Sequence, residues 1–152
     1  ASGCQILADY VRALIDGANL KSLVRTLRLK KDAAFLRELL LPGGTVSPER
    51  IVQHGFSSSA AELFAGSALA QAAQAAEAAA AGGSLTELER LCDNAALNVI
   101  GRARRVPFGV EVPVGYVAAR ENELMSVRLV ITGLLAGIPA DQIRERLRET
   151  NG

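Results

Sequence analysis

The stretch at residues 112–148 most constrains what this chain can fold into. It reads VPVGYVAARENELMSVRLVITGLLAGIPADQIRERLR, with Pro113 where a helix can begin and Gly137 where a left-handed cap can end it. Apolar residues recur on nearly every side of the helix predicted over residues 113–137. Because a helix that is apolar nearly all round is usually covered by other elements, we expect this one to lie inside the protein.

Charged side chains interrupt the middle of this predicted helix, at Arg120, Glu121, Glu123 and Arg128. Glu121 and Arg128 are seven residues apart on the apolar stripe. A charge held in an apolar environment needs a partner. We therefore interpret Glu121 as one end of a polar network that includes an arginine, either Arg25 or Arg128.

The remaining chain predicts further helices and no strand. Helical periodicity and cap residues place them at residues 6–29, 32–41, 48–55, 60–65, 68–81, 84–104 and from residue 139 onward. Asp32, Ser47, Ser59 and Ser84 stand where helix N-caps are needed. The predicted fold class is all-α, a bundle of long and short helices without a sheet.

Length and composition favour one domain. A chain of 152 residues with 49% hydrophobic residues can build a core, and we expect residues 1–152 to form one helical unit. The alanine-rich tract 68–81 has the strongest helix preference in the chain, and with Gly82 and Gly83 it is a candidate internal hinge. The chain begins without Met, and its only Met is Met125, so we expect a fragment of a longer protein, with a naturally short protein as the alternative.

Charge and rare residues exclude several classes of function. The formal net charge of +1 gives no electrostatic reason to expect a nucleic-acid partner. The apolar run at residues 129–138 is far shorter than the ~20 residues of a membrane span, so we expect no membrane insertion. Cys4 and Cys92 are the only cysteines and His54 is the only histidine, too few for a zinc site. They fit free thiols in a reducing compartment and a capping or surface histidine.

No motif for catalysis or cofactor binding stands out. The turn at Pro42-Gly43-Gly44-Thr45 is glycine-rich but lacks the lysine and the preceding strand of a phosphate-binding loop. Glu121 and Glu123 are two apart on a helix and point about 200° away from each other, so they cannot share one substrate. We predict no catalytic residue, no cofactor and no metal site.

Two other classes of function stay open. One is a generic helical interaction module, or a helix-turn-helix nucleic-acid binder that uses basic residues near two predicted helix ends: Lys30, Lys31, Arg102, Arg104 and Arg105. Steep salt dependence of DNA binding would favour the second form. The other class is a helical enzyme, which requires a cleft that holds titratable groups with shifted pKa values.

Four blocks of sequence, in order along the chain, resemble the C subunit of the A/V-type rotary ATPases, which is the counterpart of the d subunit of the eukaryotic V-ATPase. The first is Asp16-x-x-Asn19-Leu20 followed by Leu23 and Arg25. The second is LLPGG at 40–44 with SPER at 47–50, and the third is LER at 88–90 with Asp93-Asn94. The fourth is the opening stretch itself, with RENE at 120–123, Arg128, GLLAGIP at 133–139 and IRERL at 143–147.

The resemblance covers essentially the whole chain but only the C-terminal half of the family, whose full-length members are built as three related helical domains in a funnel. It implies a non-catalytic central-rotor adaptor, cytoplasmic and peripheral to the membrane. Its partners would be the membrane rotor (proteolipid) ring and the subunits of the central shaft, in a motor that couples rotation to proton or sodium transport. We expect an architectural role for six residues: Asp16, Asn19, Arg25, Glu121, Glu123 and Arg128.

Overall fold

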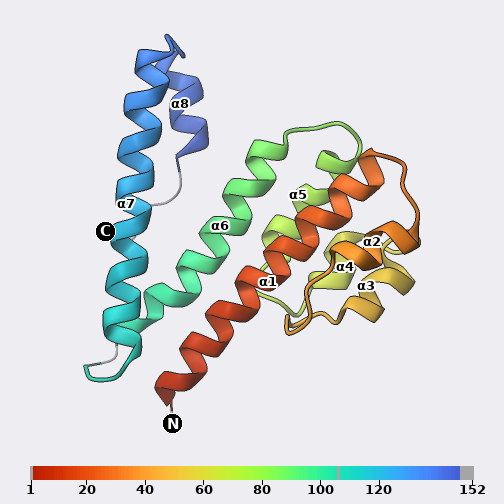
Figure 1. Ribbon diagram of the computed structural model, residues 1–152, viewed down its shortest axis with the longest axis horizontal. Helices are drawn as coiled ribbons and strands as arrows, with labels where there is room; N and C mark the ends of the chain where they lie inside the picture. Colours follow the sequence, from red (N-terminus) through yellow and green to blue (C-terminus); the bar gives the residue numbers. More distant parts are fainter. Residues whose placement is uncertain (1, 106, 148–152) are drawn as a thin grey trace.

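The computed structural model describes residues 2–105 and 107–147, and side chains of residues 5–103, 105 and 107–147. The described chain is helical and has no strand, which confirms the predicted all-α class. In order, the elements are α1 (Ser2–Arg28), α2 (Ala33–Leu39), α3 (Pro48–His54), α4 (Ala60–Phe64), α5 (Ala70–Ala80), α6 (Leu85–Gly101), the 3-10 helix η1 (Arg102–Arg105), α7 (Glu111–Leu135) and α8 (Ala140–Arg146) (Figure 1).

The helix starts follow the predicted caps. Each of the four cap side chains accepts a hydrogen bond from a backbone N–H in the first turn: Asp32 from Phe35 at 2.9 Å, Ser47 from Arg50 at 3.3 Å, Ser59 from Glu62 at 3.1 Å and Ser84 from Glu87 at 3.1 Å. These bonds satisfy N–H groups that have no partner within the helix, so local sequence is enough to set where these four helices begin.

The main core lies where α1 packs against α5 and α6, and the short helices α2, α3 and α4 gather around the C-terminal half of α1 (Figure 1). Leu20, Leu23, Leu36, Ile51 and Phe64 are fully buried there. On α5 every inward position is alanine, namely Ala72, Ala73, Ala76 and Ala79, and these small side chains let the three helices approach closely.

The alanine tract ends in a glycine cap. Gly82 has a positive φ of 110°, and the Gly83 N–H donates to the Ala78 carbonyl oxygen at 2.8 Å. This is the bonding pattern that closes a helix C-terminus. The helix in this tract is confirmed, whereas its action as a hinge stays a prediction.

Helix α7 is the exception to the predicted packing. Its inner face touches α6, η1, α1 and α8, and Gly115, Ala118 and Asn122 are buried there. Its outer face is open to solvent, and Leu124 is 70% exposed. The expectation that this helix lies inside the protein is therefore wrong, because only one of its two apolar stripes is covered.

A small second cluster joins α7 to the rest of the molecule. Ile100, Ala103 and Ala118 are its buried members, and Ile6, Leu7 and Tyr10 of α1 pack against it. The cluster lies at the end where α6, η1 and α7 meet, and α7 diverges from α6 beyond it (Figure 1). This cluster therefore attaches α7 to the main body near one end of the helix.

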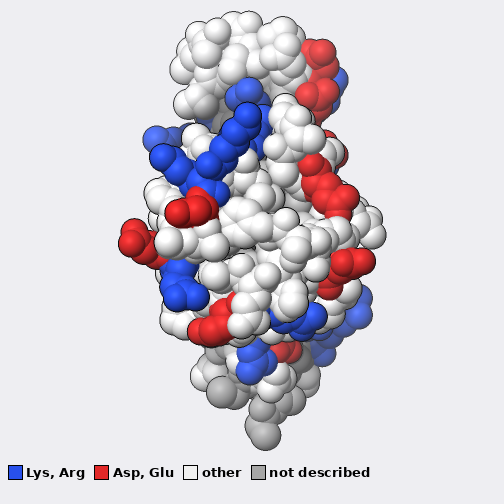
Figure 2. Space-filling view, turned by 90° about the vertical axis from the view of Figure 1, so that its right-hand side faces the viewer, with Lys and Arg blue, Asp and Glu red and all other residues white. Residues whose placement is uncertain are grey.

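Charged side chains do not gather into a field of one sign on the face that carries α2 and α3. Figure 2 shows Lys and Arg interspersed with Asp and Glu over this side of the molecule. The mixture agrees with the formal net charge of +1.

Candidate functional site

Two buried polar residues on α1 hold the loop that follows α2. Asn19 Nδ2 donates to the Leu41 carbonyl oxygen at 2.9 Å, and the Leu41 N–H donates to Asn19 Oδ1 at 2.8 Å. One turn earlier, Asp16 Oδ1 accepts from the Val46 N–H at 3.2 Å. Asp16 and Asn19 are both fully buried. The two side chains therefore attach residues 41–46 to the middle of α1, and we call this contact the α1 clamp.

Gly44 lies within the α1 clamp, and no residue larger than glycine fits at this position. A Cβ atom on Gly44 would collide with Asp16 Oδ1. The glycine-rich turn at 42–45 thus allows the backbone to approach a buried carboxylate. A carboxylate facing this turn would repel a phosphate, which gives a physical reason against phosphate binding there.

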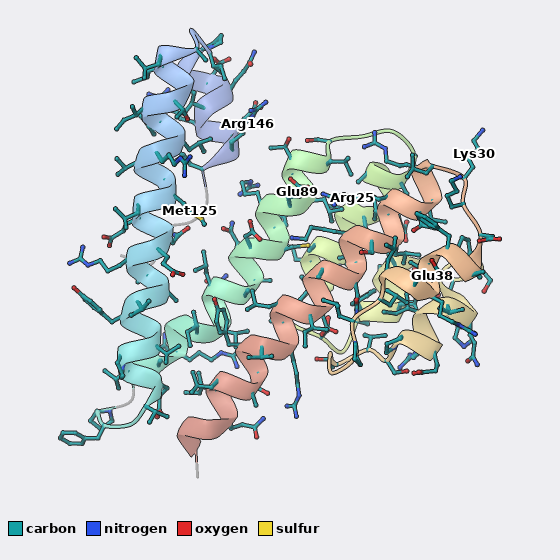
Figure 3. The ribbon with its side chains drawn as sticks, viewed as in Figure 1. Arg25, Lys30, Glu38, Glu89, Met125 and Arg146 are labelled. Atoms are coloured by element: carbon teal, nitrogen blue, oxygen red, sulfur yellow. The ribbon has the colours of Figure 1, made fainter. Side chains whose placement is uncertain are left out.

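A second set of charged contacts joins α1 to α6. Arg25 Nη2 lies 2.7 Å from Glu89 Oε1, and Lys21 Nζ lies 3.9 Å from Asp93 Oδ1. Figure 3 shows Arg25 and Glu89 side by side between the two helices. Arg25 was expected as a possible partner of Glu121, and the structure instead pairs it with Glu89. Both side chains are largely exposed, so this ion pair contributes little to stability.

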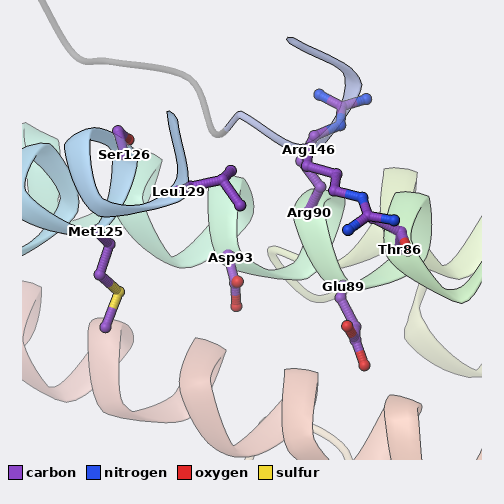
Figure 4. A pocket seen from close by; sticks show the side chains of 8 residues that line it. All are labelled: Thr86, Glu89, Arg90, Asp93, Met125, Ser126, Leu129 and Arg146. Carbon is purple, nitrogen blue, oxygen red and sulfur yellow. The ribbon is translucent and has the colours of Figure 1, made fainter. Parts of the chain in front are cut away.

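A cleft of about 220 Å³ separates α6 from α7 and α8. It is lined by Thr86, Glu89, Arg90, Asp93, Met125, Ser126, Leu129 and Arg146 (Figure 4). A neighbouring hollow of about 200 Å³ continues it toward α1 and includes Tyr10, Leu97, Ala118 and Glu121. The lining mixes apolar side chains with charges of both signs.

The pKa values in this region move away from neutrality. Burial raises the pKa of the Tyr10 phenol, and the carboxylates of Glu121 and Asp93 raise it further. Burial likewise raises the pKa of the Cys92 thiol to about 12. A general base or a nucleophile is most effective with a pKa near 7, so neither group is prepared for catalysis.

The three charged residues of α7 that were expected to be architectural do not meet in the core. Glu121, Glu123 and Arg128 are all exposed. Arg120 Nη1 instead pairs with Glu123 Oε2 at 2.6 Å, one turn away, and its guanidinium also lies 5.3 Å from the centre of the Tyr116 ring. Burial of Glu121 was a wrong expectation, because its side chain is exposed and borders the open hollow that also contains Tyr10 and Ala118.

The buried polar residues of the α7 region were missed from the sequence. Glu111 is buried at the start of α7, with its carboxylate packed under Gly109, whose φ of 149° and close approach leave no room for a side chain. Asn94 on α6 and Asn122 on α7 are also buried. The blocks DN at 93–94 and RENE at 120–123 contain these two asparagines, so their position in the motifs was the available signal.

The basic residues proposed for nucleic-acid binding do not form one surface. Lys30 and Lys31 follow the C-terminus of α1, whereas η1, with Arg102 and Arg105, packs near its N-terminal half. Because α1 has 27 residues, these groups are separated by most of a helix of about 40 Å. The side chains of Arg104 and Cys4 lie outside the described residues.

Among the residues that the structure describes, no group of three or more His, Cys, Asp and Glu side chains is placed to hold a metal ion. The described helices include none that is both long and apolar enough to cross a bilayer.

Taken together, these contacts define an all-helical protein in which polar side chains join helices and loops. The family model described as ATP synthase (C/AC39) subunit matches residues 2–146, and the chain belongs to this family.

Two curated relatives point to the same family. The chain is similar to the C subunit of the A-type ATP synthase of Thermococcus onnurineus (strain NA1), at 27% identity over 92% of this chain and 38% of the relative. It is also similar to the C subunit of the A-type ATP synthase of Desulfurococcus sp. (strain SY), at 26% identity over the same shares. The chain thus spans less than half the length of the curated relatives it matches. No solved structure matches it.

Proposed function

We propose that this chain is part of a non-catalytic adaptor in the central rotor of an A/V-type ATP synthase or ATPase. The observation that carries the proposal is the family match, which extends over nearly the whole chain. In this role the protein links the membrane rotor ring to the subunits of the central shaft, and rotation is coupled to ion transport through it. It acts at the cytoplasmic surface of the membrane, as a peripheral component of the complex.

The contacts within the fold support a role in transmitting force. The α1 clamp uses two hydrogen bonds of Asn19 and one of Asp16 to attach a loop to the longest helix. The α5 alanines pack that helix closely against its neighbours. The close packing of α1, α5 and α6 would resist deformation of this body. Asp16 and Asn19 are proposed to fix the loop at 41–46 against α1, since a buried polar contact of this kind has a fixed geometry.

The experiment is a binding assay with separated parts of a rotary ATPase from the same organism. The chain is immobilised and exposed in turn to the detergent-solubilised proteolipid ring, the isolated central shaft and the isolated catalytic head. We expect binding to the ring or the shaft and none to the head. Failure to bind either rotor part would overturn the proposal.

The competing interaction-module function predicts a different pattern. A general helical module would retain partners that are unrelated to rotary ATPases, and a nucleic-acid binder would retain DNA with an affinity that falls steeply with salt. The separation of the two basic groups argues against the second. A DNA-binding titration at two salt concentrations therefore provides a direct control.

A further inference from the structure

We propose that the hollow between the first turns of α6 and α8 binds a phosphate group through Arg90, Arg146 and Thr86. The ligand is a small molecule with a phosphate group, either free in solution or carried by a lipid. Binding there does not require the adaptor role, so the two functions can be tested separately.

Two helices bring the three side chains to one opening. A hollow of about 760 Å³ lies between the beginning of α6 and α8, beside the cleft of about 220 Å³, and Thr86, Arg90 and Arg146 line both. Thr86 and Arg90 are four residues apart, so they share one face of α6. Arg146 comes from the last turn of α8. Figure 4 shows the side chains of Arg90 and Arg146 next to each other where the two helices meet.

The two arginines have no acidic partner in the protein. Neither Arg90 nor Arg146 forms an ion pair with a carboxylate in the described part of the chain. The carboxylates that line the 220 Å³ cleft are Glu89 and Asp93, and each of them pairs with a basic residue of α1 instead. Two neighbouring guanidinium groups repel each other, and a bound anion would offset this repulsion.

The other charges around the larger hollow leave it positive. Arg144 adds a third positive charge to the lining, and Glu87 and Glu145 add two negative charges. Glu87 lies in the first turn of α6, where the positive end of the helix dipole offsets part of its charge. Three arginines against two glutamates leave an excess of one positive charge. This excess suits a small anion better than a nucleic acid, which needs many separate phosphate contacts.

The chemistry of these side chains favours a phosphate over a carboxylate. Each guanidinium presents a planar fork of N–H donors. A carboxylate has two oxygens and one charge, which a single arginine can satisfy. A phosphate monoester has three acceptor oxygens and a charge of about −1.5 to −2 at neutral pH. It can therefore accept hydrogen bonds from Arg90, Arg146 and the Thr86 hydroxyl at the same time.

The primary test is a titration of the purified chain with pyrophosphate up to about 10 mM, followed by the amide resonances in NMR spectra. We expect saturable shifts with a Kd of about 1 mM or below, confined to the beginning of α6 and to α8. A chloride titration over the same range of ionic strength is the control for screening, and it should not reproduce these shifts.

Substitutions test which side chains bind the anion. Arg90→Gln and Arg146→Gln should each weaken pyrophosphate binding by about tenfold, because each removes charge-assisted hydrogen bonds. Glu145→Gln should strengthen it by roughly threefold, because it removes a negative charge from the lining. Arg37→Gln changes an exposed arginine on α2 and is the matched control, with no expected effect. The circular-dichroism signal should stay unchanged for Arg146→Gln, because Arg146 is exposed.

Vesicles distinguish the two sources of the phosphate group. The chain is sedimented with phosphatidylcholine vesicles that contain or lack phosphatidic acid, whose headgroup is a phosphate monoester. Retention that requires phosphatidic acid and is lost in Arg146→Gln would assign the site to a lipid headgroup. Pyrophosphate binding without retention on vesicles would assign it to a soluble phosphate compound.

Three results would overturn the proposal. The first is the absence of saturable shifts over the whole titration. The second is an equal loss of affinity in Arg37→Gln and Arg146→Gln, because the effect would then come from net charge alone. The third is tighter binding of a glutamate-rich peptide than of pyrophosphate at the same residues, which would assign the arginines to an acidic protein segment.

Discussion

At the scale of single residues, the side-chain amide of Asn19 joins α1 to the loop after α2 through two hydrogen bonds. It satisfies both backbone groups of Leu41 from a fully buried position on α1. We expect Asn19→Ala to lower the free energy of unfolding by about 2–3 kcal/mol, because it removes two hydrogen bonds and leaves two backbone groups without partners. Urea unfolding followed by circular dichroism measures the loss.

Asn98→Ala is the control for this substitution. Asn98 is exposed on α6, so its replacement should change stability by less than about 0.5 kcal/mol. If Asn19→Ala also costs less than about 1 kcal/mol, the loop at 41–46 is held by other contacts and the α1 clamp is not important for stability.

Lys30 adopts a conformation that a lysine does not favour. Its φ of 52° is left-handed, and the N–H of Lys31 closes α1 by donating to the Thr26 carbonyl oxygen at 3.1 Å. Glycine adopts this conformation without the steric cost of a Cβ atom. We expect Lys30→Gly to raise the free energy of unfolding by about 0.5–1 kcal/mol, measured by urea unfolding.

The neighbouring substitution Lys31→Gly tests whether conformation is the cause. Lys31 is not left-handed, so glycine there should be neutral or destabilising. Equal effects of the two substitutions would show that removal of a positive charge, rather than relief of backbone strain, changes the stability.

Residue roles were predictable from the sequence only in part. Asp16 and Asn19 were expected to be architectural because they lie in a block that resembles the family. Their partners are backbone groups of a loop more than twenty residues away. The path of that loop depends on tertiary packing and not on local sequence, so the contact itself could not be predicted.

At the scale of elements, the starts of the four capped helices were predictable and the environment of the helices was not. Cap residues act through hydrogen bonds within one turn, so Asp32, Ser47, Ser59 and Ser84 indicated the helix starts correctly. Helix α7 has two apolar stripes on opposite sides, and periodicity does not tell which stripe is covered. Its partial exposure, and with it the position of Glu121, could be found only in three dimensions.

Gly133 sets the distance between α7 and α8. A Cβ atom there would lie 2.8 Å from Ile143 Cδ1 and 2.9 Å from Ile143 Cγ1. We expect Gly133→Val to push α8 away from α7, at a cost of about 1–3 kcal/mol to their contact. Amide hydrogen exchange should then accelerate in α8 by at least about fivefold while α1 and α6 are unaffected.

Thr132→Val is the matched control, since it places the same side chain on the adjacent, exposed position of α7. The double variant Gly133→Val with Ile143→Ala should lose less than the sum of the two single variants, because the smaller residue makes room for the valine. Additive losses would mean that the two residues do not contact each other in solution.

At the scale of the whole molecule, the reactivity of Cys92 can be used to monitor the packing of α1 against α5 and α6. Its side chain is buried in the main core, and a Cβ atom on Gly17 of α1 would lie only 3.5 Å from the Cβ atom of Cys92. Burial raises the pKa of this thiol from 9.0 to about 12, so at about pH 8 the folded thiol is both covered and protonated. In a Cys4→Ser background we therefore expect a thiol reagent to react only when the core opens.

The raised pKa also predicts how stability depends on pH. The unfolded thiol loses its proton above pH 9, whereas the folded thiol keeps it up to about pH 12. The contribution of Cys92 is therefore fully present below pH 9 and is lost as the pH rises from 9 to 12, by roughly 1 kcal/mol per pH unit. Urea unfolding of Cys4→Ser and of the double variant Cys4→Ser with Cys92→Ala, compared across this range, isolates the effect, because other groups titrate equally in both. Two outcomes would contradict these expectations: equal slopes of unfolding free energy against pH in the two variants, or labelling of the native protein at the rate of the unfolded chain. Either would show that α1 and α6 separate readily and that the molecule is not the rigid body that the adaptor role requires.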